Sequence, residues 1–120
     1  MIYIGTDIVN ISRINQIISD KGQRFLSRVF TENEQSICNA KASPHIHYGG
    51  KFAAKEAVKK VLLSSKERIN ISFNAIEIQN KCDGAPKVLI NDNTGCAGNI
   101  QVSISHTDEY AIAAAILEIK

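Results

Sequence analysis

The 120-residue sequence lacks the features that mark secreted, membrane-spanning or disulfide-bonded proteins. It opens with MIYIGTDIVN, which has an acid at position 7, no basic leading segment and no long apolar run. We therefore expect neither a signal peptide nor a membrane span, and we expect a cytoplasmic protein. Its three cysteines are far apart and form no Cys-x-x-Cys pair (Cys38, Cys82 and Cys96). This spacing argues against a disulfide framework or structural zinc and favours free thiols.

The chain also has little net charge. Fourteen lysines and arginines stand against twelve acids, for a net charge of +2, which is less basic than a dedicated nucleic-acid-binding protein. There is no Gly-x-Gly-x-x-Gly and no P-loop, so nucleotide binding of those kinds has no support. One local basic cluster stands out in the first quarter (Arg13, Lys21, Arg24 and Arg28). Such clusters are usually solvated surface.

The composition that remains, 44% hydrophobic and 22% charged, is that of an ordinary globular protein, and we expect a single domain over residues 1–120. Residues 2–9 predict a strand, and the apolar spacing that follows predicts a helix from Ile11 to about Ser19. A brief helical piece is expected at 25–29. A capping box at Thr31 and Glu34 predicts a helix over 32–42, and a longer helix is expected over about 47–64.

The second half of the chain has the period of strands. We expect strands at 73–79, 87–90, 100–105 and 110–119, with a turn at 83–86 and a polar loop that contains Gly95 and Gly98. The last segment is almost continuously apolar, which predicts a strand buried on both faces. A first strand, then helices, then an antiparallel meander makes an α+β fold. The small alanines of the last strand would admit a second surface, so we expect a homo-oligomer.

Glu56 is the only acid among four bases in KFAAKEAVKK, residues 51–60. It shares one helical column with Phe52 and Lys60. The simpler interpretation is a Glu56–Lys60 ion pair that supports an exposed helix by roughly 0.2–0.5 kcal/mol. The alternative is that Glu56 belongs to a site.

Asp7 is the second candidate, because it lies near the end of a strand that otherwise resembles core. An acid there needs an exposed edge, a charged partner or a metal. If Asp7 and Glu56 converge, they supply two hard oxygen ligands. That is the usual protein share of a magnesium site, whose other positions go to water and substrate phosphates.

The third candidate is the strand end Ser103–Thr107, SISHT. Its hydroxyls and imidazole suit phosphate oxygens, although a capped turn explains them equally well. Ser105 and His106 are adjacent and point to opposite faces of a strand, so they make a poor nucleophile pair. His45 and His47 have no evident third metal ligand, and we interpret them as exposed loop histidines.

Taken together and in order, these segments resemble the holo-[acyl-carrier-protein] synthases, the short trimeric type of 4'-phosphopantetheinyl transferase. The resemblance spans essentially the whole chain and is most specific at FAAKEA and SISHT. It implies the 4'-phosphopantetheinyl transferase fold and a homotrimer with active sites at subunit clefts. It further implies magnesium-dependent transfer of phosphopantetheine from coenzyme A to a serine of apo-acyl carrier protein, in fatty acid biosynthesis, with release of adenosine 3',5'-bisphosphate.

The resemblance also implies roles for individual residues. Asp7 and Glu56 would be the magnesium ligands and, with Lys60, the catalytic residues. Lys60 would also meet the pyrophosphate. Glu56, or a water held near it, would accept the serine proton.

The remaining implied roles concern the two substrates. The coenzyme A phosphates would lie at the strand end formed by Ser105, His106 and Thr107. The turn containing Gly84 and Pro86 would lie beside adenosine. Arg13 and Arg24 would dock the acidic carrier protein.

The chain departs from the family pattern at two positions. Lys51 stands where arginine is common, which replaces a bidentate contact with a point charge. Ala85 stands where lysine is common. Two other functions stay open: a non-catalytic module that binds coenzyme A or carrier protein, and a magnesium-dependent phosphohydrolase. The latter would lack the acids of a two-metal site.

Overall fold

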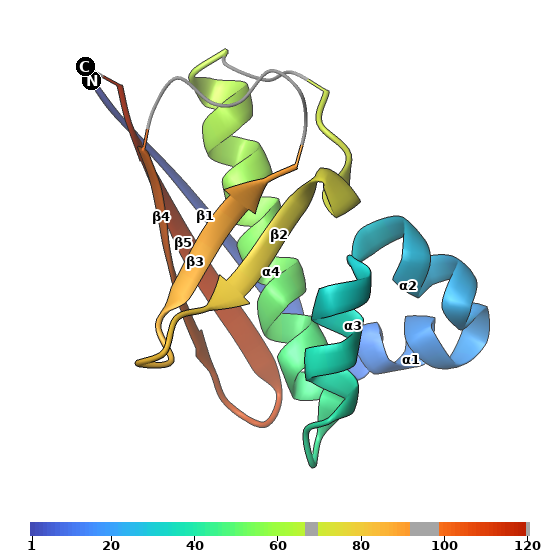
Figure 1. The fold of residues 1–120 in the computed structure, drawn as a ribbon. Coiled ribbons are helices and arrows are strands. Elements are labelled where there is room, and N and C mark those ends of the chain that lie inside the picture. The colour runs from blue at the N-terminus through green and yellow to red at the C-terminus, as the bar shows by residue number, and fades with distance from the viewer. Residues whose placement is uncertain (67–69, 92–98, 120) are drawn as a thin grey trace.

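The computed structural model describes residues 1–66, 70–91 and 99–119 (Figure 1). The predicted loop with Gly95 and Gly98, and the predicted free thiol of Cys96, lie outside the described residues. Cys38 and Cys82 are both free. Within the described residues, no helix has the length and apolar character needed to cross a membrane.

The elements follow the predicted order and confirm the α+β class. They are β1 (Ile2–Asn10), α1 (Ile11–Lys21), α2 (Gln23–Val29), α3 (Glu32–Asn39), α4 (Pro44–Ser64), the 3-10 helix η1 (Phe73–Ala75), β2 (Ile76–Asn80), β3 (Pro86–Ile90), β4 (Asn99–His106) and β5 (Tyr110–Glu118). The predicted helix over 32–42 ends three residues early, and the strand predicted at 73–79 begins with η1.

The start of α4 corrects one prediction. Pro44 occupies the first turn of the helix, where its missing N–H costs nothing because that group has no intrahelical partner. His45 and His47 are therefore helical rather than loop residues, and both are partly buried.

The strands divide between two antiparallel sheets rather than one meander. In the larger sheet β5 lies between β1 and β4, and β2 pairs with β3 in the smaller one. The first strand pairs with the last along its whole length, from Ile2 opposite Glu118 to Asn10 opposite Tyr110. Sequence periodicity indicates strands but not partners, so this pairing was not predicted.

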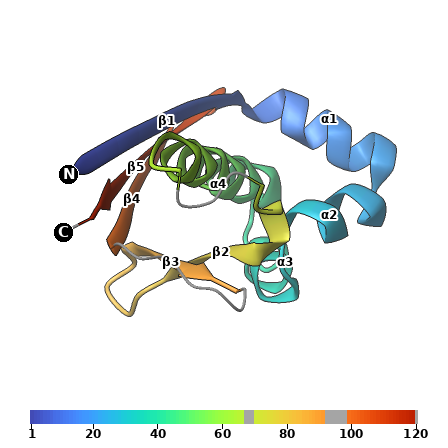
Figure 2. The same cartoon turned by 90° about the horizontal axis from the view of Figure 1, so that it is seen from above.

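Helix α4 runs between the two sheets, and Figure 2 shows it from above with β1 and β5 on one side and β2 and β3 on the other. Its fully buried alanines allow close approach to the larger sheet (Ala53, Ala54 and Ala57). Gly5 of β1 completes this contact, because a side chain there would collide with the carbonyl oxygen of Ala57. The close packing fixes α4 relative to β1.

Strand β5 corrects a second prediction. Ala111, Ala113 and Ala115 are buried, whereas Tyr110, Ile112 and Ile116 are exposed, so the strand is buried on one face within a single chain. With three residues of β1, the exposed residues form what we call the outer face, whose side chains are 44–66% exposed (Ile2, Ile4, Ile8, Tyr110, Ile112 and Ile116).

A buried ion pair anchors α4 on its other side. Thr31 and Glu34 form the predicted capping box of α3. The same Glu34 carboxylate pairs with Lys55 at 2.5 Å and accepts the backbone N–H of Ile78 at 2.7 Å. Lys55 donates to the carbonyl of Val29 at 2.7 Å. These contacts anchor the part of α4 that carries Glu56, the residue next to Lys55.

Candidate active site

Asp7 and Lys60 meet where β1 crosses α4. Asp7 points to the same side of β1 as the buried Gly5 and Val9, toward the helix. The Lys60 ammonium lies 3.3 Å from Asp7 Oδ1 and donates to the Thr6 carbonyl at 2.8 Å. Within the described residues, Lys60 forms no ion pair with Glu56, so the helical Glu–Lys pair of the simpler interpretation is replaced by a contact between elements.

The second oxygen of Asp7, Oδ2, is buried, and it has no hydrogen-bond partner among the described residues. Glu56 lies near enough for the two charges to interact. Burial raises the pKa of Glu56 above its ordinary value, the charge of Asp7 raises it further, and Lys59 and Lys60 oppose the shift. Lys60 already contacts Oδ1 of Asp7. A second cation bound between the two carboxylates would relieve their repulsion and give Oδ2 a partner.

This arrangement fits magnesium. Both candidate donors are hard carboxylate oxygens, and Mg²⁺ is commonly held by one or two carboxylates plus water and substrate phosphates. Within the described residues, no group of three or more potential metal-binding side chains is present. The protein would therefore contribute Asp7 and Glu56 and leave the other positions open.

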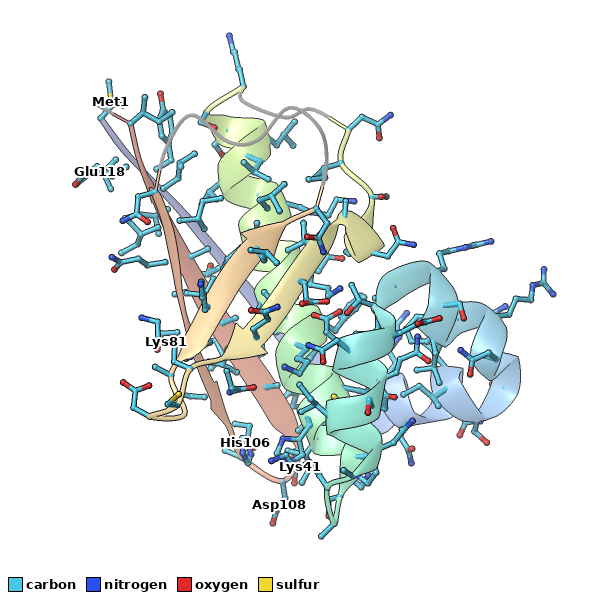
Figure 3. All side chains as sticks on the ribbon, viewed as in Figure 1. Met1, Lys41, Lys81, His106, Asp108 and Glu118 are labelled. Atoms are coloured by element: carbon cyan, nitrogen blue, oxygen red, sulfur yellow. The ribbon has the colours of Figure 1, made fainter. Side chains whose placement is uncertain are left out.

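A separate pocket of about 340 Å³ lies at the other end of α4, and we call it the basic pocket. Its polar and turn-forming lining consists of Lys41, His47, Lys51, Asn80, Gly84, Pro86 and His106. Figure 3 shows Lys41 and His106 close together at this end of the molecule. The structure thus gathers three of the predicted coenzyme A-binding residues, Gly84, Pro86 and His106.

No sequence signal assigned Lys41 or Asn80 to a site, and His47 was expected in an exposed loop. His47 and Lys51 are spaced by one helical turn and face the same pocket, a signal that was available once the helix start at Pro44 was recognised. Asn80 and Lys41 carried no comparable signal, because each depends on the packing of α3 and the smaller sheet around α4.

A hydrogen-bond chain shapes the wall of the basic pocket. The Lys51 ammonium donates to the carbonyl of Ile78 at 2.8 Å and to Asn80 Oδ1 at 3.4 Å. Asn80 Nδ2 donates in turn to the carbonyl of Gly84 at 3.1 Å. Gly84 has a φ of 88°, which favours glycine. Among the described residues, Lys51 uses two of its three donors in these bonds, which leaves one for a ligand.

The structure does not group Ser105 and Thr107 with His106. His106 lines the basic pocket, whereas Ser105 pairs with Ile112 on the outer face. The Thr107 hydroxyl oxygen accepts the N–H groups of Glu109 and Tyr110, at 3.2 and 3.1 Å. These bonds cap the β4–β5 turn, and the hydroxyl proton of Thr107 stays available to a ligand.

The two groups of polar residues lie on different sides of α4. At about 100° per residue, Glu56 lies about 140° around the helix from Lys51, and Lys60 about 180°. Neither Glu56 nor Lys60 lines the basic pocket. One chain therefore cannot present both groups to the same stretch of substrate from one face of this helix.

Arg13 and Arg24 lie on a third surface. Both are exposed, Arg13 on α1 and Arg24 on the adjacent α2. Arg24 and two further basic residues, Lys21 and Arg28, line a shallow hollow of about 110 Å³ beside Phe25. The predicted basic patch is thus an exposed, cationic surface of the first two helices.

Comparisons with known proteins agree along nearly the whole chain. The model of the 4'-phosphopantetheinyl transferase superfamily matches residues 3–115. The holo-[acyl-carrier-protein] synthase of Protochlamydia amoebophila is 43% identical over 116 residues, 94% of each chain. That of Thermodesulfovibrio yellowstonii is 40% identical over 114 residues, which cover 95% of this chain and 96% of the relative.

Solved structures show the same fold. The holo-(acyl-carrier-protein) synthase of Bacillus anthracis in complex with CoA (3',5'-ADP) superimposes with a TM-score of 0.82 and 31% identity, over 98% of this chain and 96% of that one. The Helicobacter pylori holo-[acyl-carrier-protein] synthase in complex with coenzyme A has a TM-score of 0.76 and 29% identity, over 96% and 99% of the two chains.

Proposed function

The chain belongs to the 4'-phosphopantetheinyl transferase superfamily, and on that basis we propose that it works as a holo-[acyl-carrier-protein] synthase. It transfers the 4'-phosphopantetheine of coenzyme A to a serine of apo-acyl carrier protein and releases adenosine 3',5'-bisphosphate. Within the structure, the observation that carries the proposal is the unpartnered buried Oδ2 of Asp7 beside Glu56. A bound cation would give that oxygen a partner and relieve the repulsion between the two carboxylates.

Asp7 and Glu56 would hold magnesium, and a bound ion would offset the negative charge of the pyrophosphate. Lys60 is 52% exposed, so its ammonium can reach a phosphate while it stays near Asp7. The serine oxygen forms a bond to the phosphorus that carries pantetheine, and the bond from that phosphorus to the bridging oxygen of the adenosine phosphate breaks. Glu56, directly or through a water, takes the serine proton.

The basic pocket would hold the adenosine end of coenzyme A. His106 and the free donor of Lys51 meet phosphate oxygens, while Gly84 and Pro86 form the wall beside the nucleoside. Thr107 can add its hydroxyl proton. Ser105 lies on the outer face, so it would reach a phosphate only at a contact between subunits.

We further propose a homotrimer, supported by two observations. The outer face exposes six large apolar side chains, an arrangement that marks an interaction surface. The carboxylate site and the basic pocket lie on different sides of α4, so a cleft between neighbouring copies would let one copy supply each. Arg13 and Arg24 would then dock the acidic carrier protein, by an attraction that weakens with salt.

One assay tests the function. The protein is incubated with coenzyme A, magnesium and apo-acyl carrier protein, and the carrier is weighed by mass spectrometry. A carrier that gains one phosphopantetheine supports the transferase, and a carrier of unchanged mass overturns it. Loss of phosphate from coenzyme A without carrier modification would indicate the phosphohydrolase. Binding of coenzyme A with neither product would indicate the non-catalytic module.

A further inference from the structure

The basic pocket gathers nitrogen-bearing side chains from separate parts of the chain. Lys41 precedes α4, His47 and Lys51 lie on α4, and His106 ends β4. All of the lining residues are within the described part of the chain, and none of them is acidic. A volume of about 340 Å³ is within the range of small-molecule sites. The pocket therefore suits an anionic ligand and offers it no competing carboxylate.

His47 is set apart from the other three groups by its surroundings. Partial burial lowers its pKa below the ordinary value of 6.5, and the charges of Lys41, His106 and Lys51 lower it further. In the ligand-free protein near neutral pH, His47 is therefore mostly uncharged. A phosphate in the pocket would offset these positive charges and favour the protonated ring.

We propose that His47 contacts a phosphate group of the ligand in the basic pocket and takes up a proton when that ligand binds. The inference rests on the proposed function, which supplies the ligand class, a nucleotide that carries phosphates at both its 3' and 5' ends. Because the bound form holds more protons than the free form, nucleotide affinity falls as the pH rises. Each unit by which binding raises the pKa of His47 changes the affinity by up to about tenfold.

The chain contains a matched control. His45 lies two residues earlier in the same turn of α4 and is absent from the pocket lining. Adenosine 3',5'-bisphosphate is titrated into the protein by calorimetry, at one pH near 6.5, in buffers of different ionisation enthalpy. The dependence of the heat on the buffer gives the number of protons taken up. The measurement is made for the unaltered protein, for His47→Gln and for His45→Gln.

We expect uptake of up to about one proton in the unaltered protein and in His45→Gln, and a clear loss of uptake in His47→Gln. His47→Gln should also flatten the fall of affinity with pH. Equal uptake in His47→Gln and the unaltered protein would overturn the inference and assign the proton to His106. If the unaltered protein binds no nucleotide at all, the proposed function fails along with the inference.

Discussion

The Lys60 ammonium lies 3.3 Å from Oδ1 of Asp7, a residue 53 positions earlier in the chain. Oδ2 of the same carboxylate is buried and unpartnered. Asp7 is thus held on one side and unsatisfied on the other, with the Glu56 carboxylate nearby. A cation bound beside Oδ2 would satisfy this oxygen, so the geometry favours a metal site.

Removing either carboxylate should stop transfer without unfolding the protein. We expect Asp7→Asn and Glu56→Gln each to lower kcat by about a hundredfold or more, because charge neutralisation and proton acceptance are both affected. In metal-free buffer the free energy of unfolding should hold or rise slightly, since each change relieves the repulsion between the two acids. Transfer assays and urea unfolding measure the two effects. Glu32→Gln, at an exposed position on α3, is the control, and near-normal turnover in either site variant would show that the carboxylates are not the reaction centre.

The outer face should be required for assembly. Ile112 is 47% exposed on the outer face, and Leu63 is 55% exposed near the end of α4. We expect Ile112→Glu to reduce the sedimentation mass from three chains to one and to lower transfer in parallel, because a buried unpaired carboxylate is costly. Leu63→Glu is the control, because it introduces the same charge at a similarly exposed apolar residue away from the outer face. An Ile112→Glu protein that keeps both its mass and its activity would show that this face is not an interface.

The sequence predicted the elements well because each depends on local chemistry. The capping box of Thr31 and Glu34 and the period-two alternation of residues 100–105 in β4 are visible in consecutive residues. The pairing of β1 with β5, and the second role of Glu34 as the partner of Lys55, depend on contacts between distant segments. Those contacts also decide the site. The residues alone did not predict that Asp7 and Glu56 converge; only the family resemblance implied it. The hydrogen-bond chain through Asn80 had no sequence signal.

The pair formed by Lys55 and Glu34 should be the most costly polar contact to break. Both side chains are fully buried, so removal of one partner leaves an uncompensated charge. We expect Lys55→Met to lower the free energy of unfolding by about 3–5 kcal/mol, measured by urea denaturation. Lys55→Met combined with Glu34→Gln should lose less than the sum of the single changes. Lys87→Met, at an exposed position, should change the free energy little. Strict additivity of the two single changes would show that the two groups are not coupled.

Asn80 should affect the binding of coenzyme A and not the binding of the carrier protein. It joins the Lys51 ammonium to the carbonyl of Gly84, and thereby holds the turn that forms one wall of the basic pocket. We expect Asn80→Ala to raise KM for coenzyme A about fivefold, the equivalent of a hydrogen bond of about 1 kcal/mol. KM for the carrier and kcat should stay near their original values. Asn80→Asp keeps the acceptor for Lys51 but loses the donor to Gly84 and adds a negative charge to the pocket, so it should not recover the loss, whereas Asn91→Ala should have no effect. A uniform fall in kcat for Asn80→Ala would point to general distortion instead.

Magnesium should stabilise the protein in a pH-dependent way that reports on the two carboxylates independently of turnover. Burial and Asp7 raise the pKa of Glu56, so folding alone favours its protonated form, and this contribution is lost as the pH rises through the raised pKa. Metal binding has the opposite dependence, because it requires both carboxylates ionised. The increase in Tm that magnesium produces should therefore be largest at neutral pH and shrink as the pH falls through the raised pKa. Thermal unfolding with and without magnesium, across that pH range, measures it. Asp7→Asn and Glu56→Gln should abolish the increment and Glu32→Gln should retain it, whereas an increment that persists unchanged in both site variants would place the ion elsewhere on the chain.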